Sequence, residues 1–281
     1  MHWIAHTAAS ALAPVAEAAD ALAGVVPGAP RRQRSSLRHS GHRPWLVPGR
    51  PWVMGQSWCD LLFAHWPVPA DALRAHVPPE LELDLFDGEA WVSVTPFEVR
   101  GTRPRGALPP PVLSCFPELN VRTYVTVADR PGIWFFSLDA ASALAVMAAR
   151  TVYRLPYFRA RMRIEGERDE GFSYVSERTD PRGAPAAFRG RYAPLGAHRH
   201  AEPGSLEAWL VERYRLYTVD RGQVYAADIH HRPWTLQDVD ADIERNTMAA
   251  PLGLDLSGEP LVQYAARQDV VFWPLVRIET G

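Results

Sequence analysis

Four side chains with useful chemistry stand at every second position of the segment ELNVRTYVTV, residues 118–127. They are the carboxylate of Glu118, the amide of Asn120, the guanidinium of Arg122 and the phenol of Tyr124. The residues between them are mostly apolar, and side chains alternate between the two faces of a β-strand. The segment is therefore predicted to be a strand whose functional face meets either bulk water or a cavity where these groups converge on a ligand.

The chain of 281 residues contains no lysine, and all 30 of its basic residues are arginine. Arginine stays protonated in proteins and does not act as an amine nucleophile. A GC-rich genome that favours arginine codons is a sufficient origin for this bias, but the chemical consequence is the same. No side chain of this protein can form a Schiff base, so decarboxylation by a side-chain imine is excluded.

Sequence motifs for cofactors and metals are absent or weak. The chain has no glycine-rich phosphate loop, no dinucleotide-binding fingerprint and no G-x-S-x-G nucleophile motif. Metal ligands would have to come from His198 and His200, or from Asp228, His230 and His231. Neighbouring histidines of this kind more often make hydrogen bonds at a rim. We therefore predict no metal and no cofactor.

The segment His231-Arg232-Pro233-Trp234 leaves a predicted strand at its proline. Two interpretations stay open for it. Trp234 packs into a corner of the core, or His231 and Trp234 both lie at the mouth of a pocket and contact a ligand.

Composition limits the class of partner. The formal net charge of −2 and the isoelectric point of about 6.6 give no basic excess for nucleic acid. No apolar run approaches the roughly 18–20 residues of a membrane span. The two cysteines, Cys59 and Cys115, are too few for a disulfide scaffold and fit a reducing compartment. We expect a soluble, cytoplasmic protein and leave an oligomer open.

Strand-like segments with turns between them dominate the chain after Trp52. Short helices are predicted near residues 69–77, 140–150 and 205–214. Hairpin turns are predicted at Asp87-Gly88, at residues 128–131 and at Arg221-Gly222. Residues 269–278 are predicted to form a last apolar strand. The pattern favours a mainly β, antiparallel barrel or sandwich in one domain.

Residues 1–48 differ in composition from the rest. An alanine-rich stretch is followed by a linker rich in proline, glycine, serine and arginine. We predict a flexible or partly helical tail over 1–48 and a β domain over 49–281. Deletion of the tail is expected to leave the melting temperature nearly unchanged.

Three stretches together resemble the acetoacetate decarboxylase-like superfamily, and within it the YqjF-like branch. They are DALRAHVPPELELD at 71–84, CFPELNVRTYV at 115–125 and ARTVYRLPYF at 149–158. The order and spacing of the stretches agree with that superfamily. The resemblance implies a mainly β cone or barrel that encloses a small apolar pocket, in agreement with the strand pattern.

The resemblance also assigns positions in that pocket. Glu118 falls on the superfamily's active-site glutamate, and Arg150 on its arginine. The paired lysines of the decarboxylase, one of which lowers the pKa of the other, are replaced here by Tyr157 and Phe158. The chain therefore resembles the superfamily in its barrel and pocket but lacks the lysine amine that reacts in the decarboxylase.

With Glu118 inside the barrel, the strand period carries Asn120, Arg122 and Tyr124 to the same interior face. A buried arginine needs a partner, because an unpaired buried charge is very costly. Two alternatives remain. Glu118 and Arg122 form an internal ion pair that only fills the barrel, or the face forms a pocket for an anion or keto acid.

The favoured hypothesis is a barrel that binds a small carbonyl or carboxylate compound, as a lysine-independent lyase, hydratase or isomerase. Glu118 and Tyr157 are the candidate catalytic residues, with Glu118 as general acid/base and Tyr157, or alternatively Tyr124, as oxyanion donor. The candidate substrate-binding residues are Asn120, Arg122, Tyr124, Arg150, His231 and Trp234. The alternatives are a non-catalytic carrier or sensor and a structural interaction protein.

Overall fold

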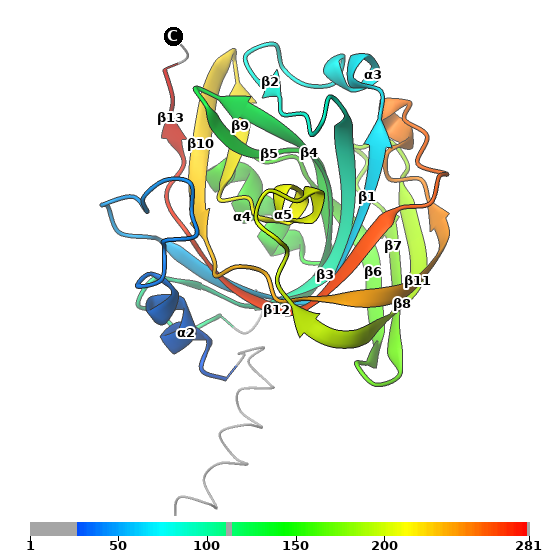
Figure 1. The fold of residues 1–281 in the computed structure, drawn as a ribbon, viewed down its shortest axis with the longest axis horizontal. Helices are drawn as coiled ribbons and strands as arrows, with labels where there is room; N and C mark the ends of the chain where they lie inside the picture. Colours follow the sequence, from blue (N-terminus) through cyan, green and yellow to red (C-terminus); the bar gives the residue numbers. More distant parts are fainter. Residues whose placement is uncertain (1–26, 111–113, 280–281) are drawn as a thin grey trace, which may run out of the picture.

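A computed structural model of the chain describes residues 27–110 and 114–279, and they form a mainly β structure (Figure 1). The strands are β1 (Met54–Val68), β2 (Glu82–Leu83), β3 (Ala90–Pro104), β4 (Cys115–Val127), β5 (Arg130–Ala140), β6 (Tyr157–Glu167), β7 (Gly171–Arg178), β8 (Ala187–Arg199), β9 (Arg215–Asp220), β10 (Gln223–His230), β11 (Leu236–Asn246), β12 (Leu261–Phe272) and β13 (Val276–Arg277). The helices are α2 (Ala29–Ser36), α3 (Ala70–Arg74), α4 (Ala143–Tyr153), α5 (Leu206–Val211) and the 3₁₀ helix η2 (Ala250–Leu252).

The strands form one sheet that curls into two ring-like halves. Their order is β13-β10-β9-β5-β6-β7-β8-β11-β12-β1-β3-β4-β2, with additional pairings β10–β12 and β4–β5. These pairings make β12-β1-β3-β4-β5 a wall common to both halves. The wall and β6, β7, β8 and β11 form what we call the packed ring, whereas the wall, β9 and β10 form the hollow ring. In Figure 1, α4 and α5 lie within the outline of the hollow ring.

The two faces of β4 look into different rings. Leu119 and Val121 belong to the large apolar cluster that fills the packed ring, together with Tyr174 of β7 and Phe188 of β8. The alternate residues, beginning with Glu118, point into the hollow ring. The strand period predicted from the sequence is therefore present, and neither face of β4 meets bulk water.

Tight turns explain the antiparallel pairs of consecutive strands. The β4–β5 turn has Ala128 at φ 50° and Asp129 at φ 57°, and the β9–β10 turn has Arg221 at φ 53° and Gly222 at φ 73°. Two successive residues with positive φ give the backbone twist that matches paired strands. Both hairpins predicted from the sequence at these positions are present.

Two serines begin the helices near the hollow ring. The Ser142 hydroxyl accepts a hydrogen bond from the Ala145 amide at 3.2 Å, and the Ser205 hydroxyl accepts one from the Ala208 amide at the same distance. Each bond satisfies an amide that the first helical turn leaves unpaired. α4 continues three residues beyond its predicted end, to Tyr153.

Two predicted strand arrangements are wrong. The turn at Asp87-Gly88 forms, but β2 pairs with β4 and not with β3. The C-terminal strand is interrupted between β12 and β13, where Pro274 has no amide hydrogen to donate to a ladder. In both cases, tertiary pairing or a missing donor overrides the local pattern.

Residues 27–48, predicted as part of a flexible or partly helical tail, include the helix α2 and contact the β-strands. Gln33 of α2 is 1% exposed, accepts a hydrogen bond from Arg103 at 2.5 Å and donates one to the Gln56 carbonyl at 2.9 Å. Arg43 donates to the Ile229 carbonyl at 2.5 Å, and Trp45 donates to Asp228 at 3.0 Å. Residues 27–48 therefore pack on the β domain, whereas the alanine-rich stretch lies outside the described residues.

We therefore expect deletion of residues 1–48 to lower the melting temperature by about 10 °C, because several buried hydrogen bonds worth about 1 kcal/mol each are lost. Deletion of residues 1–26 is the matched control, since it keeps every contact just described. Differential scanning calorimetry of the two shortened chains measures the difference. Equal melting temperatures would contradict the packing of residues 27–48.

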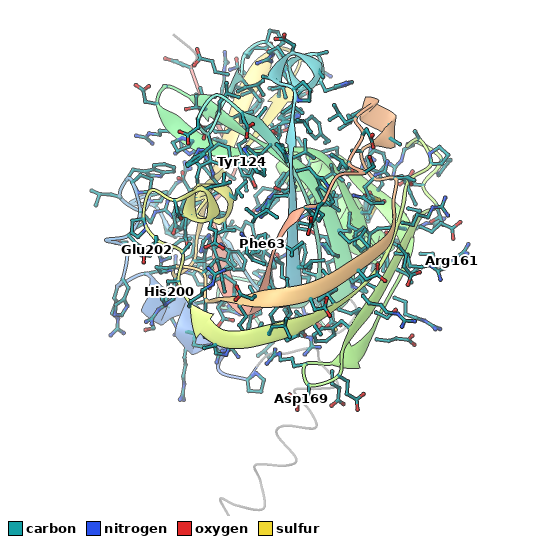
Figure 2. All side chains as sticks on the ribbon, turned by 45° about the vertical axis from the view of Figure 1, so that its right-hand side comes forward. Phe63, Tyr124, Arg161, Asp169, His200 and Glu202 are labelled. Carbon is teal, nitrogen blue, oxygen red and sulfur yellow. The ribbon has the colours of Figure 1, made fainter. Side chains whose placement is uncertain are left out.

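The outer surface of the packed ring is solvated. Arg159, Arg161 and Arg163 of β6 are exposed, and Arg161 pairs with Glu177 of β7 at 3.2 Å. Figure 2 shows Arg161 at the outer edge and Phe63 and Tyr124 inside the molecule. Over residues 27–110 and 114–279, no helix is both long and apolar enough to cross a membrane.

Candidate functional site

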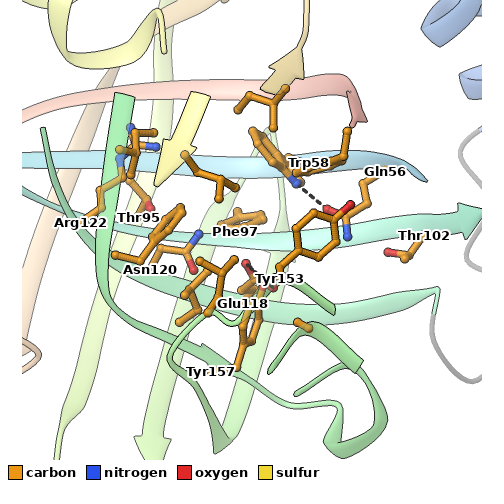
Figure 3. Close-up of a pocket in the computed structure, with 18 of the residues that line it drawn as sticks. Gln56, Trp58, Thr95, Phe97, Thr102, Glu118, Asn120, Arg122, Tyr153 and Tyr157 are labelled. Atoms are coloured by element: carbon orange, nitrogen blue, oxygen red, sulfur yellow. Dashed lines mark hydrogen bonds between the residues drawn. The ribbon is translucent and has the colours of Figure 1, made fainter. Parts of the chain in front are cut away.

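A cavity of about 210 Å³ lies inside the hollow ring (Figure 3). Its walls come from the common wall, from β9 and β10 and from the inner side of α4. Most of the lining is aromatic or aliphatic. The polar and ionisable lining residues are Gln56, Thr95, Thr102, Glu118, Asn120, Tyr153, Arg122, Tyr157, Arg213 and His231.

The cavity has a closed end and a mouth. The closed end is formed by Phe63, Arg122, Arg213 and Trp234, all of which are buried. The mouth is formed by the partly exposed Met54, Gln56 and Thr102 and by Val152, which is 61% exposed. The polar groups between the two ends follow the order of residues along β4. Arg122, Asn120 and Glu118 stand at alternate positions of this strand and pair with Ser93, Thr95 and Phe97 of β3.

Glu118 and Tyr157 form a hydrogen-bonded pair between the two ends. The Tyr157 hydroxyl donates to the carboxylate of Glu118, at 3.2 Å from Oε1 and 3.1 Å from Oε2. Tyr157 stands at the start of β6, whose first residues run parallel to the end of β5. On the packed-ring side, the Tyr174 hydroxyl donates to the Glu118 carbonyl at 2.8 Å and fixes the backbone.

Burial gives Glu118 the ionisation of a general acid/base. It raises the pKa of this carboxyl from 4.5 to about 7, while hydrogen bonds from Tyr157 and Asn120 oppose the rise. The pKa of Tyr157 is raised well above its ordinary value by burial and by the neighbouring Glu118. At neutral pH, Glu118 can therefore take up or release a proton, whereas Tyr157 stays a hydrogen-bond donor.

The raised pKa of Glu118 makes a stability prediction. The folded state keeps a proton between pH 4.5 and about 7 that the unfolded chain releases. Its contribution to the free energy of unfolding is therefore largest near pH 4.5 and is lost as the pH rises to 7, by up to about 3 kcal/mol. Urea unfolding measures the free energy of unfolding of the wild type and of Glu118→Gln. The wild-type value minus the Glu118→Gln value should fall by this amount between pH 4.5 and 7 and stay constant above pH 7.

The comparison with Glu118→Gln is needed because other groups titrate in the opposite sense. Burial lowers the pKa of His230 and of His231 to about 4, so their contribution to stability falls as the pH is lowered. That contribution is common to both proteins and cancels in their difference. A difference that does not change between pH 4.5 and 7 would contradict the raised pKa of Glu118.

Arg122 lies at the closed end, where none of the described residues neutralises its charge. Its Nη2 donates a long hydrogen bond to the Leu210 carbonyl at 3.5 Å, and its guanidinium carbon lies 5.5 Å from the centre of the Phe63 ring. Its Nε is buried without a hydrogen-bond partner. Within the described ranges, none of these contacts compensates the charge, so the alternative of an internal ion pair with Glu118 is not formed. An uncompensated buried charge favours an anion beside it.

A second arginine at the closed end is neutralised. Arg213 forms an ion pair with Asp84 and donates through Nε to the Trp209 carbonyl at 2.7 Å. Its guanidinium carbon also lies 4.3 Å from the centre of the Trp209 ring. The local charge at the closed end is therefore carried by Arg122.

Several polar atoms of the cavity wall have no hydrogen-bond partner in the described part of the chain. They include Asn120 Oδ1, Trp234 Nε1, Thr102 Oγ1 and the Tyr153 hydroxyl. Asn120 is 7% exposed and adjoins Glu118 through its hydrogen bond. Buried polar atoms normally find partners, so these atoms are available to a ligand or to water.

Two predicted binding residues do not line the cavity. The ring of Tyr124 is covered by Trp209 at 4.5 Å between ring centres, and its hydroxyl lies 2.6 Å from the Ser93 hydroxyl. Arg150 donates to the Tyr157 carbonyl at 3.0 Å and ties α4 to the start of β6. Tyr124 therefore packs outside the cavity wall at the closed end. Arg150 holds the backbone of Tyr157 in place.

His231 and Trp234 line the closed end and not the mouth. The ring nitrogens of His231 lie 2.7 Å from the Arg232 carbonyl and 3.3 Å from the Arg213 carbonyl. Trp234 stacks on Trp58 at 6.1 Å and meets the edge of Phe63 at 4.8 Å between ring centres. Both side chains pack in the core, as the first interpretation has it for Trp234, and both line the cavity, but at its closed end and not at a mouth.

The histidine groups do not form a metal centre in the described part of the chain. Over these residues no cluster of three or more histidine, cysteine or acidic side chains is arranged to hold a metal ion. Asp228 is engaged by Arg215 at 2.9 Å and by Trp45. His200 is hydrogen-bonded to the Trp234 carbonyl at 2.7 Å.

Sequence reasoning missed several lining residues. Arg213 lies within the helix predicted over 205–214, and Tyr153 lies within the stretch 149–158 that carries the family resemblance. Trp58 and Phe63 belong to an aromatic segment predicted only as a strand. A two-residue period on that segment places Leu61 and Phe63 on one face, but nothing in the sequence shows which ring that face enters.

Comparison with known proteins agrees with this architecture. The family model DUF2071, described as an uncharacterized conserved protein, matches residues 55–269. The uncharacterized protein YqjF of Bacillus subtilis (strain 168) is 50% identical over 230 residues, which cover 82% of this chain and 94% of that protein.

Two solved structures are similar in fold. One is the enduracididine biosynthesis enzyme MppR complexed with pyruvate, with a TM-score of 0.55, 13% identity, and coverage of 86% of this chain and 95% of that chain. The other is an acetoacetate decarboxylase-like enzyme from Sphingomonas wittichii RW1, also with a TM-score of 0.55, 13% identity and 86% coverage of this chain, and covered over 100% of its own length. The chain has the acetoacetate decarboxylase-like fold and belongs to the DUF2071 family, which it shares with YqjF.

Proposed function

We propose that the cavity of the hollow ring binds a carboxylate compound that also carries a carbonyl group. The observation that carries this proposal is the uncompensated Arg122 at the closed end of an otherwise apolar cavity. A planar guanidinium can hold a carboxylate through two parallel hydrogen bonds. The pyruvate complex of MppR, a protein of the same fold, is consistent with an oxo acid in such a cavity.

The proposed chemistry is proton transfer beside a carbonyl. Glu118 removes or returns a proton, and Tyr157 turns its hydroxyl from Glu118 to the oxygen on which negative charge develops. Asn120 adds a free amide oxygen next to the pair. These groups suit a lyase, hydratase or isomerase that needs no amine, and the chain has no lysine to supply one.

Titration of the full chain with an oxo acid and with its methyl ester tests the binding step. Trp58 and Trp234 line the cavity, so their fluorescence reports occupancy. The acid should bind saturably and the uncharged ester far more weakly. Equal affinities would show that Arg122 does not hold a carboxylate.

A non-catalytic carrier or sensor is the second candidate, because an enclosed, mostly apolar cavity also suits simple ligand storage. Saturable binding without any proton exchange or turnover would favour it.

The charge balance supports no nucleic-acid partner, and the two free cysteines, Cys59 and Cys115, fit the cytoplasm.

A further inference from the structure

We infer that the ligand is an elongated carboxylate with an apolar body, which enters carboxylate first and whose reacting carbonyl lies several carbons from the carboxylate. This inference rests on the proposed function and adds to it the length and polarity of the ligand. It follows from the order of groups along the cavity.

The anion site and the acid/base pair are far apart along β4. Arg122 and Glu118 are separated by four positions, or about 13 Å of strand at about 3.3 Å per residue. The Arg122 guanidinium lies over the Phe63 ring of β1 and donates to the Leu210 carbonyl, and within the described residues no ion pair joins it to Glu118. Asn120 lies between and hydrogen-bonds Glu118.

A three-carbon oxo acid does not span this arrangement. Its carbonyl is bonded directly to the carboxylate, so a carboxylate held by Arg122 leaves the carbonyl near Asn120 and Thr95. A carbonyl beside Glu118 and Tyr157 requires further carbons between the two functional groups. The site therefore favours γ- and δ-oxo acids over α-oxo acids.

The cavity continues beyond Glu118 toward the mouth. Trp58 and Phe272 pack edge to face at 6.0 Å between ring centres, and Tyr153 packs against Phe272 at 6.3 Å. This part of the wall is aromatic and suits an apolar chain or ring. The inner side of α4 contributes small side chains here, Ala145, Ala148 and Ala149, which leave room for it.

Among the described residues, two buried oxygens of the cavity wall, from Tyr153 and Thr102, have no hydrogen-bond partner and are available to a ligand or to water. Tyr153 is 93% buried, as its 7% exposure implies, and its hydroxyl has no hydrogen-bond partner. Thr102 Oγ1 is likewise buried and unpartnered, and Thr102 lies near Gln56 at the mouth in Figure 3. Polar atoms at both ends and aromatic rings between them match an elongated amphipathic molecule.

Straight-chain monocarboxylates from acetate to decanoate test the inference by fluorescence titration of the full chain. We expect the affinity to rise about fourfold for each added methylene until the chain reaches the mouth, and then to level off. An affinity that is flat from propionate onward overturns the inference. Among oxo acids, 4-oxopentanoate and 5-oxohexanoate should bind more tightly than pyruvate.

Ala149→Phe places a ring in the aromatic part of the cavity between Glu118 and the mouth. It should weaken octanoate binding at least tenfold and leave propionate binding unchanged. Met147, on the same helix, is 60% exposed. Met147→Phe is therefore the matched control and should change the affinity for neither octanoate nor propionate. Equal effects of Ala149→Phe on both acids would overturn the proposed path, and circular dichroism confirms that each variant is folded.

The proposed function fails in a different way. Arg122→Met should weaken every acid of the series by a similar factor. The contrary result is that Arg122→Met binds every acid as tightly as the wild type, with the same dependence on chain length. That result would refute the carboxylate site but would still support an elongated apolar ligand. Binding of short and long acids with equal affinity, but only with Arg122 present, would refute the elongated ligand alone.

Discussion

Replacing Arg122 by methionine is expected to weaken carboxylate binding at least 100-fold and, at the same time, to raise the melting temperature by several degrees. A guanidinium that makes two charge-assisted hydrogen bonds to a carboxylate contributes about 3 kcal/mol or more. Within the described residues, the same charge is buried beside the Phe63 ring and makes a long hydrogen bond to the Leu210 carbonyl. Removing it relieves a desolvation cost, and methionine fills a similar volume.

The opposite signs make this result specific. A structural ion pair would lose stability on substitution, whereas a site kept ready for an anion loses affinity and gains stability. Arg159→Met is the matched control, because Arg159 is exposed on β6 and should change neither quantity. Calorimetric titration and thermal unfolding measure the two effects. A lower melting temperature in Arg122→Met would mean that Arg122 mainly stabilises the fold.

Glu118→Gln is expected to slow proton exchange at the carbon next to the carbonyl of a bound oxo acid by 10² to 10⁴-fold, the usual contribution of a positioned general base. Exchange in D₂O, followed by proton NMR, requires no knowledge of the complete reaction. Pyruvate, acetoacetate, 4-oxopentanoate and 5-oxohexanoate form a suitable set of probes. Glutamine keeps the shape of the side chain and one oxygen that accepts a hydrogen bond from Tyr157, so binding should persist.

The pH profile identifies the group that acts. Only the ionised carboxylate accepts a proton, so the wild-type exchange rate should rise with pH to a plateau with its midpoint near 7. Tyr157→Phe removes a hydrogen bond that lowers the pKa of Glu118, and the midpoint should move upward. Glu177→Gln, on the exposed side of β7, should leave rate and midpoint unchanged. Unchanged exchange in Glu118→Gln would remove Glu118 from the mechanism.

A non-catalytic carrier would give a different combination. It would show Arg122-dependent binding with no exchange in the wild type. The two substitutions therefore separate the anion site, which both candidate functions share, from the acid/base step, which only an enzyme requires.

Local sequence carries the properties that depend on neighbours along the chain. The alternation over residues 118–124 predicts a two-faced strand, and the two faces of β4 enter different rings. Turn residues at Arg221-Gly222 and the serines that cap α4 and α5 act within a few positions of themselves. The absence of lysine limits the chemistry without any structure at all. Resemblance adds the superfamily and the position of Glu118.

Tertiary structure decides what each face meets. Two rings share one wall, so both faces of β4 are buried, and strand alternation cannot distinguish the packed ring from the hollow one. Tyr124 has the same period as Glu118, but Trp209 of α5 covers it and removes it from the cavity wall.

Charge pairing is also decided over long separations along the chain. Asp84 neutralises Arg213, a residue 129 positions away, and leaves Arg122 without a carboxylate within the described residues. Residues 27–48 have the composition of a linker, yet Gln33 and Arg43 are buried against β-strands far along the chain. Composition and period describe what a segment can do locally. Which partner it meets depends on contacts that only the folded chain brings together.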